Sequence, residues 1–155
     1  MPRDIPVGNG DVLVTFDHLY RVRDLYYPNV GRFNHTDGHV QRFGVWADGR
    51  FAWIEDPSWQ RELRYERDTL VTEVRLVNES LGLQITCSDC VDFHEPVYVR
   101  RAVVKDLSGT RRDVRLFYHW DMSIRGSALG DTANYDPATS SLVLYKADIY
   151  FLFNA

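Results

Sequence analysis

The sequence predicts an all-β fold, an antiparallel β-sandwich built from about ten short strands. Three observations predict it. Apolar and polar residues alternate over short runs, turn-forming residues separate those runs, and helical periodicity is nearly absent. The chain has 155 residues, of which 45% are hydrophobic and 26% are charged, so it can bury the core of one domain or of part of a larger one.

Each predicted strand is an alternating run that ends at Gly, Asp, Asn, Ser or Pro. The runs are 12–16, 21–26, 42–47, 50–54, 63–67, 69–77, 81–88, 97–104, 114–120, 141–146 and 149–153. Residues 29–40 form a long polar loop after Pro28. Residues 56–65 are compatible with one short helix, capped by Asp56 and Pro57, or with a loop that runs into a strand.

Asp48-Gly49 predicts a two-residue hairpin between the third and fourth runs, because both positions of a type I′ turn need a positive φ. This register places Phe43, Val45, Ala52 and Ile54 on one face, and Gly44, Trp46, Phe51 and Trp53 on the other. Both faces are apolar, whereas a strand in a β-sandwich usually has one polar face exposed to solvent. Trp46, Phe51 and Trp53 therefore form a candidate aromatic face, suited to packing against another sheet or domain, to the core, or to contact with sugar.

Composition and spacing argue against several classes of function. The net charge of −4 disfavours nucleic-acid binding. No run approaches the length of a membrane span, and the N-terminus lacks a secretory signal, which predicts a cytoplasmic protein. We expect no metal and no cofactor, because His35 and His39 lie in a glycine-containing loop without ligand spacing. Cys87 and Cys90 fall on opposite faces of one strand, so we expect free thiols.

Carboxylates also cluster near the end of the seventh run. Asp89, Asp92 and Glu95 are close in sequence, and we expect them at solvated loop ends, not in an acid–base pair. Trp120 continues the inward-facing series of Val114, Leu116 and Tyr118, which predicts that it belongs to the core.

Residues 5–54 contain IPVGNGDVLVTFD, VRDLYYPNVGRFNHT and RFGVWADGRFAW, and similar segments continue to DTANYDP. This order resembles the N-terminal domain of prokaryotic glycoside hydrolase family 15, which includes glucoamylases, glucodextranases and some trehalases. The resemblance implies an N-terminal domain of the supersandwich type over residues 1–155, incomplete here, followed by a helical α/α toroid. In that family the toroid carries two catalytic glutamates, and no position here matches their motifs, so no catalytic residue is assigned.

Three functions are compatible with these features. The first is a non-catalytic domain that packs on the toroid of a glucoamylase-type enzyme acting on α-glucosidic bonds. The second is a free-standing carbohydrate-binding module, and the third is an interaction module unrelated to sugars. Under the first, the expected partners are the toroid and, through it, an α-glucan or glucoside.

The polar loop is the expected contact with the toroid and the substrate entrance, because functional contacts concentrate on loops. The candidate residues are Tyr26, Tyr27, Pro28, Asn29, Asn34 and His35. Substitution of Tyr27 or His35 should then change kinetics more than stability. An apolar run, 150–153, lies near the end of the sequence, so we also expect the isolated chain to self-associate through it or through the Trp46–Trp53 face.

The isolated chain should not release glucose from maltose, starch, dextran or trehalose, because its sequence contains no recognisable acid–base pair. The measurement is an enzymatic glucose assay on purified protein. Glucose release that one Asp or Glu substitution abolishes would contradict this expectation.

Overall fold

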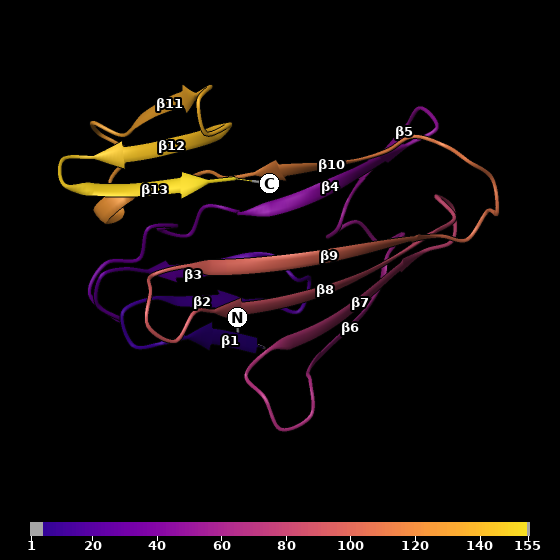
Figure 1. Cartoon of the computed structure of the whole chain (residues 1–155), viewed down its shortest axis with the longest axis horizontal. Coiled ribbons are helices and arrows are strands. Elements are labelled where there is room, and N and C mark those ends of the chain that lie inside the picture. Colours follow the sequence, from indigo (N-terminus) through magenta and orange to yellow (C-terminus); the bar gives the residue numbers. More distant parts are fainter. Residues whose placement is uncertain (1–4, 155) are drawn as a thin grey trace.

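The computed structural model of the protein describes residues 5–154 and confirms an antiparallel β-sandwich. Residues 1–4 and 155, at the ends of the expected domain, lie outside the described residues. Within the described part, thirteen strands and a single 3-10 turn, η1 (Ile124–Gly126), are present and no α-helix forms (Figure 1).

The strands form four antiparallel sheets. In three of them every strand pairs with its neighbours in sequence, and in the other β10 pairs with the distant strand β4. The first sheet contains β1 (Ile5–Gly8), β2 (Leu13–Phe16) and β3 (Val22–Tyr26), in that order. The second has the order β10 (Val114–His119), β4 (Arg42–Ala47), β5 (Arg50–Trp53). The third contains β6 (Gln60–Tyr65), β7 (Thr72–Asn78), β8 (Leu83–Val91) and β9 (Tyr98–Asp106), and the fourth contains β11 (Thr132–Asp136), β12 (Ser141–Lys146) and β13 (Ile149–Phe153).

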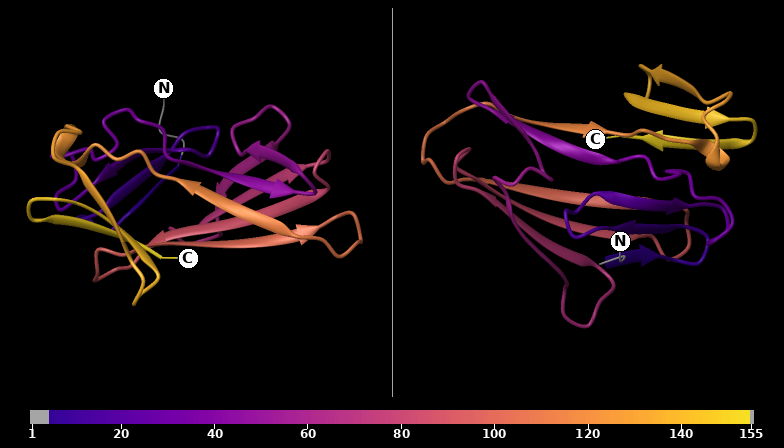
Figure 2. Two further views of the ribbon diagram at one scale, coloured as in Figure 1. Left: turned by 90° about the horizontal axis from the view of Figure 1, so that it is seen from above. Right: turned by 180° about the vertical axis from the view of Figure 1, so that it is seen from behind.

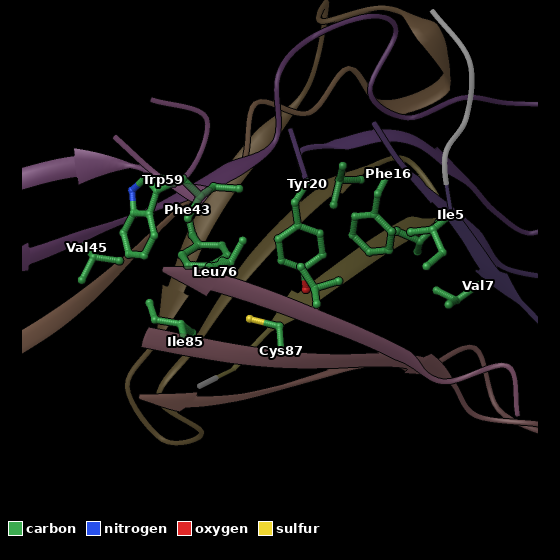
Figure 3. Close-up of a cluster of buried hydrophobic side chains, with 14 of the residues drawn as sticks. Ile5, Val7, Phe16, Tyr20, Phe43, Val45, Trp59, Leu76, Ile85 and Cys87 are labelled. Atoms are coloured by element: carbon green, nitrogen blue, oxygen red, sulfur yellow. The ribbon is translucent and has the colours of Figure 1, made fainter. Parts of the chain in front are cut away.

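The core lies between the β6–β9 sheet and the first two sheets. Leu76, Ile85 and Cys87 point from β7 and β8 toward Phe16 and Phe43 of the opposite layer (Figure 3). All five side chains are fully buried. The β11–β13 sheet lies beyond the C-terminal end of β10, and β10 runs toward it (Figures 1 and 2).

The hairpin of β4 and β5 has the predicted register. Trp46 pairs with Phe51 and Gly44 pairs with Trp53. Asp48 and Gly49 have φ values of 51° and 76°, so both turn residues are in the left-handed region that a type I′ turn requires. The inward face of this hairpin is buried as expected, including Val45 at 0% exposure.

Two strands were not predicted, and one ambiguity is resolved. β1 contains Pro6 and Gly8, and β11 contains Asn134, which are residues that usually indicate turns. Both strands form because a longer neighbour, β2 or β12, pairs with them. Residues 56–65 do not form a helix: a turn leads into β6 at Gln60, whose partner is β7. The hairpin that follows has its strand ends at Tyr65 and Thr72, so its loop is longer than predicted.

The expectation that Asp89 lies at a solvated loop end is wrong. β8 extends through Asp89, whose side chain is fully buried between the layers. Its carboxylate accepts hydrogen bonds from the hydroxyls of Tyr20, Thr72 and Tyr98 and from Nε of Arg100, which is 2.7 Å away. A buried carboxylate is tolerated when such donors and an opposite charge surround it. Asp92 and Glu95, by contrast, are exposed in the loop, as predicted.

A second arginine joins the turns at one end of the sandwich. Arg112 donates to Asp48 in the β4–β5 turn and to Asp106 at the end of β9, at 2.9 Å and 2.8 Å. Its other nitrogen donates to the carbonyl oxygens of Leu81 and Gly82. The side chain of Arg112 is only 7% exposed, so little water competes for its hydrogen bonds. These contacts therefore fix the hairpin turn to the opposite layer.

Substitution Gly49→Val should destabilise the fold by about 1–2 kcal/mol, because a β-branched residue resists the positive φ of this turn position. The urea midpoint of unfolding measures the effect. Gly49→Asn is the matched control, since asparagine tolerates the left-handed region and should retain most of the stability. Equal stability of the valine variant and the wild type would mean that the turn changes its conformation easily.

Candidate functional site

The loop between β3 and β4 is fixed to β3 by one asparagine. Oδ1 of Asn34 accepts hydrogen bonds from the backbone N–H of Leu25 at 3.1 Å and from the N–H and hydroxyl of Thr36. Its Nδ2 donates to Asp24 at 2.8 Å, and Asp24 also accepts from the Thr15 hydroxyl in β2. Asn34 therefore holds the end of the loop against β3, and both polar atoms of its amide make hydrogen bonds within the protein.

His35 lies inside the protein, at 0% exposure. Its Nε2 is 2.7 Å from the carbonyl oxygen of Tyr27, and its Nδ1 accepts a hydrogen bond from the backbone N–H of Arg125 at 3.1 Å. The ring of Phe151 meets it edge to face, with centroids 4.8 Å apart. A neutral ring that carries its proton on Nε2 can make both hydrogen bonds. Burial lowers the pKa of His35 below its ordinary value.

These contacts correct the interpretation of His35 as part of a polar surface loop. Its backbone N–H donates to Leu25 and its carbonyl accepts from Ser123, so the residue joins β3 to the segment before η1. The side chain adds a contact with β13 through Phe151. We now expect substitution of His35 to lower stability. The role of the loop as a whole at a substrate entrance stays a prediction.

The remaining candidate residues form two pairs: Tyr26 with Tyr27, and Pro28 with Asn29. We call Pro28 and Asn29 the crest of the loop. Tyr26 and Tyr27 are partly buried, whereas Pro28 and Asn29 are exposed, after a cis peptide bond between Tyr27 and Pro28. Tyr27 borders an apolar groove of about 370 Å³ between β2, β3, β13 and the start of β9. The groove is lined by Val12, Val14, Leu25, Tyr27, Pro96, Val97, Tyr98, Trp120 and residues 150–153. The exposed crest can meet another surface.

Trp120, expected in the core, lies at its margin. It is partly buried and packs against Phe153, with centroids 4.7 Å apart, at the edge of the groove. The alternating series correctly placed Trp120 on the side of the strand that faces the core, but β13 covers its ring only in part.

The candidate aromatic face lies on the outer side of the second sheet, opposite the core. Trp46 and Trp53 are partly buried, and Phe51 is 44% exposed. Arginines of the same chain lie over both tryptophans: Cζ of Arg115 is 5.1 Å from the Trp46 ring centroid, and Cζ of Arg42 is 4.2 Å from that of Trp53. The chain itself thus covers part of this second apolar face, through cation–π contacts.

Sequence reasoning missed the contribution of β10 to this face. Phe117 pairs with Gly44 and His119 pairs with Arg42, so both add their rings to the same side of the sheet. Phe117 is 46% exposed and contacts Phe51, with centroids 5.8 Å apart. The alternation in residues 114–119 indicated which of them share a face, but only the pairing of β10 with β4, distant in sequence, shows which face that is.

Cys87 and Cys90 are both free thiols, with Cys87 buried and Cys90 partly exposed, as their spacing on one strand predicted. Among residues 5–154, no group of three or more His, Cys, Asp or Glu side chains is arranged to hold a metal ion. The same residues contain no helix long and apolar enough to cross a membrane.

The fold and these surfaces define the chain as an all-β sandwich with an apolar groove bordered by β2, β3, β9 and β13 and with an outer aromatic face. Its structure is similar to that of a bacterial glucoamylase complexed with acarbose, with a TM-score of 0.77 and 14% sequence identity. The similarity covers 96% of this chain and 23% of the glucoamylase chain. No protein-family model matches the sequence, and no curated protein is significantly similar to it. The chain therefore shares the fold of part of that enzyme.

The buried neutral state of His35 should make stability fall on acidification. In the unfolded chain the ring takes up a proton near its ordinary pKa of 6.5, and the folded chain resists this until lower pH. His35 therefore contributes stability above about pH 6.5 that is lost as the pH falls below it. Urea unfolding at about pH 7.5 and about pH 5.5 should show a smaller pH dependence in His35→Gln than in the wild type.

His39 provides the opposite case and serves as the control. Its hydrogen bond to Asp121, at 2.9 Å, raises its pKa, so its contribution is present at low pH and is lost as the pH rises. His39→Gln should therefore steepen the loss of stability on acidification. Identical pH profiles for the wild type and His35→Gln would contradict the neutral buried assignment.

Proposed function

We propose that this chain is the non-catalytic N-terminal β-sandwich domain of a glucoamylase-type enzyme of glycoside hydrolase family 15. In this proposal the domain packs on a helical α/α toroid that cleaves α-glucosidic bonds, and it shapes the entrance to that catalytic centre. The observation that carries the proposal is the structural similarity to a bacterial glucoamylase over 96% of this chain and only 23% of the enzyme.

Two features of the sequence and structure support the same proposal. The segments around Gly8-Asn9-Gly10 and residues 24–28 carry the family resemblance, and both have defined structural roles. Oδ1 of Asn9 accepts hydrogen bonds from the backbone N–H groups of Asp11 and Val12, which forms the turn between β1 and β2. Residues 24–28 run from β3 into the crest of the loop.

The crest is the proposed contact with the toroid. Pro28 and Asn29 are exposed, while Asn34 and His35 anchor both ends of the segment that carries them. An exposed segment with fixed ends loses little conformational freedom when it binds a second surface, which favours a defined interface. The proposed location is the cytoplasm.

The natural full-length gene product provides the test. It should release glucose from malto-oligosaccharides, and Asn29→Ala and Tyr27→Phe should change KM or kcat several-fold while the melting temperature stays close to the wild type. Phe93→Ala is the matched control, because Phe93 is 83% exposed in the loop between β8 and β9. Absence of glucosidase activity would refute the proposed function. Unchanged kinetics in both loop variants would refute the role of the loop.

A further inference from the structure

The outer face of the second sheet carries eight residues in a regular array. The pairing of β10, β4 and β5 aligns them across the sheet. Three rows result, the first of Arg115, Trp46 and Phe51, the second of Phe117, Gly44 and Trp53, and the third of His119 and Arg42, beside which Glu55, just after β5, forms an ion pair with Arg42. The rings of Trp46, Phe51, Phe117 and Trp53 therefore occupy the first two rows, with Arg115 at the β10 edge of the first row and polar side chains in the third row.

Gly44, at the centre of the array, positions the exposed ring. A Cβ atom at Gly44 would lie 2.2 Å from Cζ of Phe51 and 2.9 Å from Cε3 of Trp53. Both rings therefore lean over the glycine, and the ring of Phe51 reaches diagonally across β4. Trp53 and Phe117 hold it in edge-to-face contacts at 4.8 Å and 5.8 Å. Phe51 is fixed in place while 44% of its surface stays in contact with solvent.

The polar groups around these rings are paired within the chain, and one pair, Arg115 with Asp113, is largely exposed, whereas the side chains of Arg42 and Glu55 are only 26% and 17% exposed. Arg115 pairs with Asp113 at 2.6 Å, and their side chains are 62% and 54% exposed. Arg42 pairs with Glu55 at the other end. The apolar face of a protein partner would have to remove these charges from water, which costs free energy. A sugar ring would also displace water, but its hydroxyls can hydrogen-bond to the charged groups in place of that water while its C–H face lies on the aromatic ring.

We propose that this face is a carbohydrate-binding platform that takes the pyranose rings of an α-glucan chain, with Phe51 and Phe117 as the stacking surfaces and Arg115 and Asp113 as hydrogen-bonding partners. The choice of a carbohydrate rests on the alternation of aromatic and charged groups. The choice of an α-linked glucose polymer rests on the proposed function. The platform lies on the second sheet, separate from the loop proposed to meet the toroid.

The test is titration of the purified chain with maltoheptaose and, separately, with cellohexaose, followed by calorimetry and by the fluorescence of Trp46 and Trp53. Maltoheptaose should bind, and Phe51→Ala and Phe117→Ala should each weaken it about tenfold, consistent with the loss of one ring contact. Gly44→Ala should weaken it as well, because the added Cβ displaces the Phe51 ring. Phe93→Ala removes a phenylalanine that is more exposed, at 83%, and lies elsewhere, and it should bind like the wild type.

Melting temperatures of all variants separate loss of binding from loss of folding. Absence of binding to either oligosaccharide, or equal weakening by Phe93→Ala, would overturn the platform and leave the glucosidase test of the parent enzyme unaffected. Binding of cellohexaose alone would overturn the assignment to α-glucans. Glucosidase activity in the parent without maltoheptaose binding to this domain would therefore distinguish failure of this inference from failure of the proposed function.

Discussion

A carboxylate and a guanidinium enclosed between the two layers constrain the rest of the structure. Asp89 and Arg100 are cross-strand partners in β8 and β9, and the Arg100 guanidinium lies 4.7 Å from the ring centroid of Tyr20 in the opposite layer. Burial raises the pKa of Tyr20 and of Tyr98, so both hydroxyls stay protonated and donate to Asp89. Removing one member of such a pair costs about 3–5 kcal/mol, against a typical domain stability of about 5–15 kcal/mol.

Local sequence signals predicted most of the strands and missed two short ones that contain turn-forming residues. The Asp48-Gly49 turn is a local signal, and it defined both faces of β4 and β5 correctly. β1 and β11 hold few residues that favour strands, and they form only because a neighbouring strand offers backbone partners. The number of strands was therefore underestimated, although the fold class was correct.

In the candidate site, the residues related by one local turn were predicted, and those that depend on distant partners were missed. Trp46, Phe51 and Trp53 were grouped correctly, because their relation depends on one turn. The burial of His35 and Asp89 was missed because their partners, Arg125 and Tyr20, are 90 and 69 residues away. A signal for Asp89 was nevertheless present: it continues the inward-facing series of Leu83, Ile85 and Cys87, and an inward-facing carboxylate requires partners.

The two thiols on β8 give this domain an internal probe of its own opening. Cys87 is fully buried and its burial raises the pKa to about 11, whereas Cys90, three residues on, lies on the other side of the strand and is partly exposed. Alkylating reagents attack the thiolate, so Cys90 reports simple access and Cys87 reports only separation of the layers. The ratio of their labelling rates therefore measures how often the sandwich opens, without any engineered label.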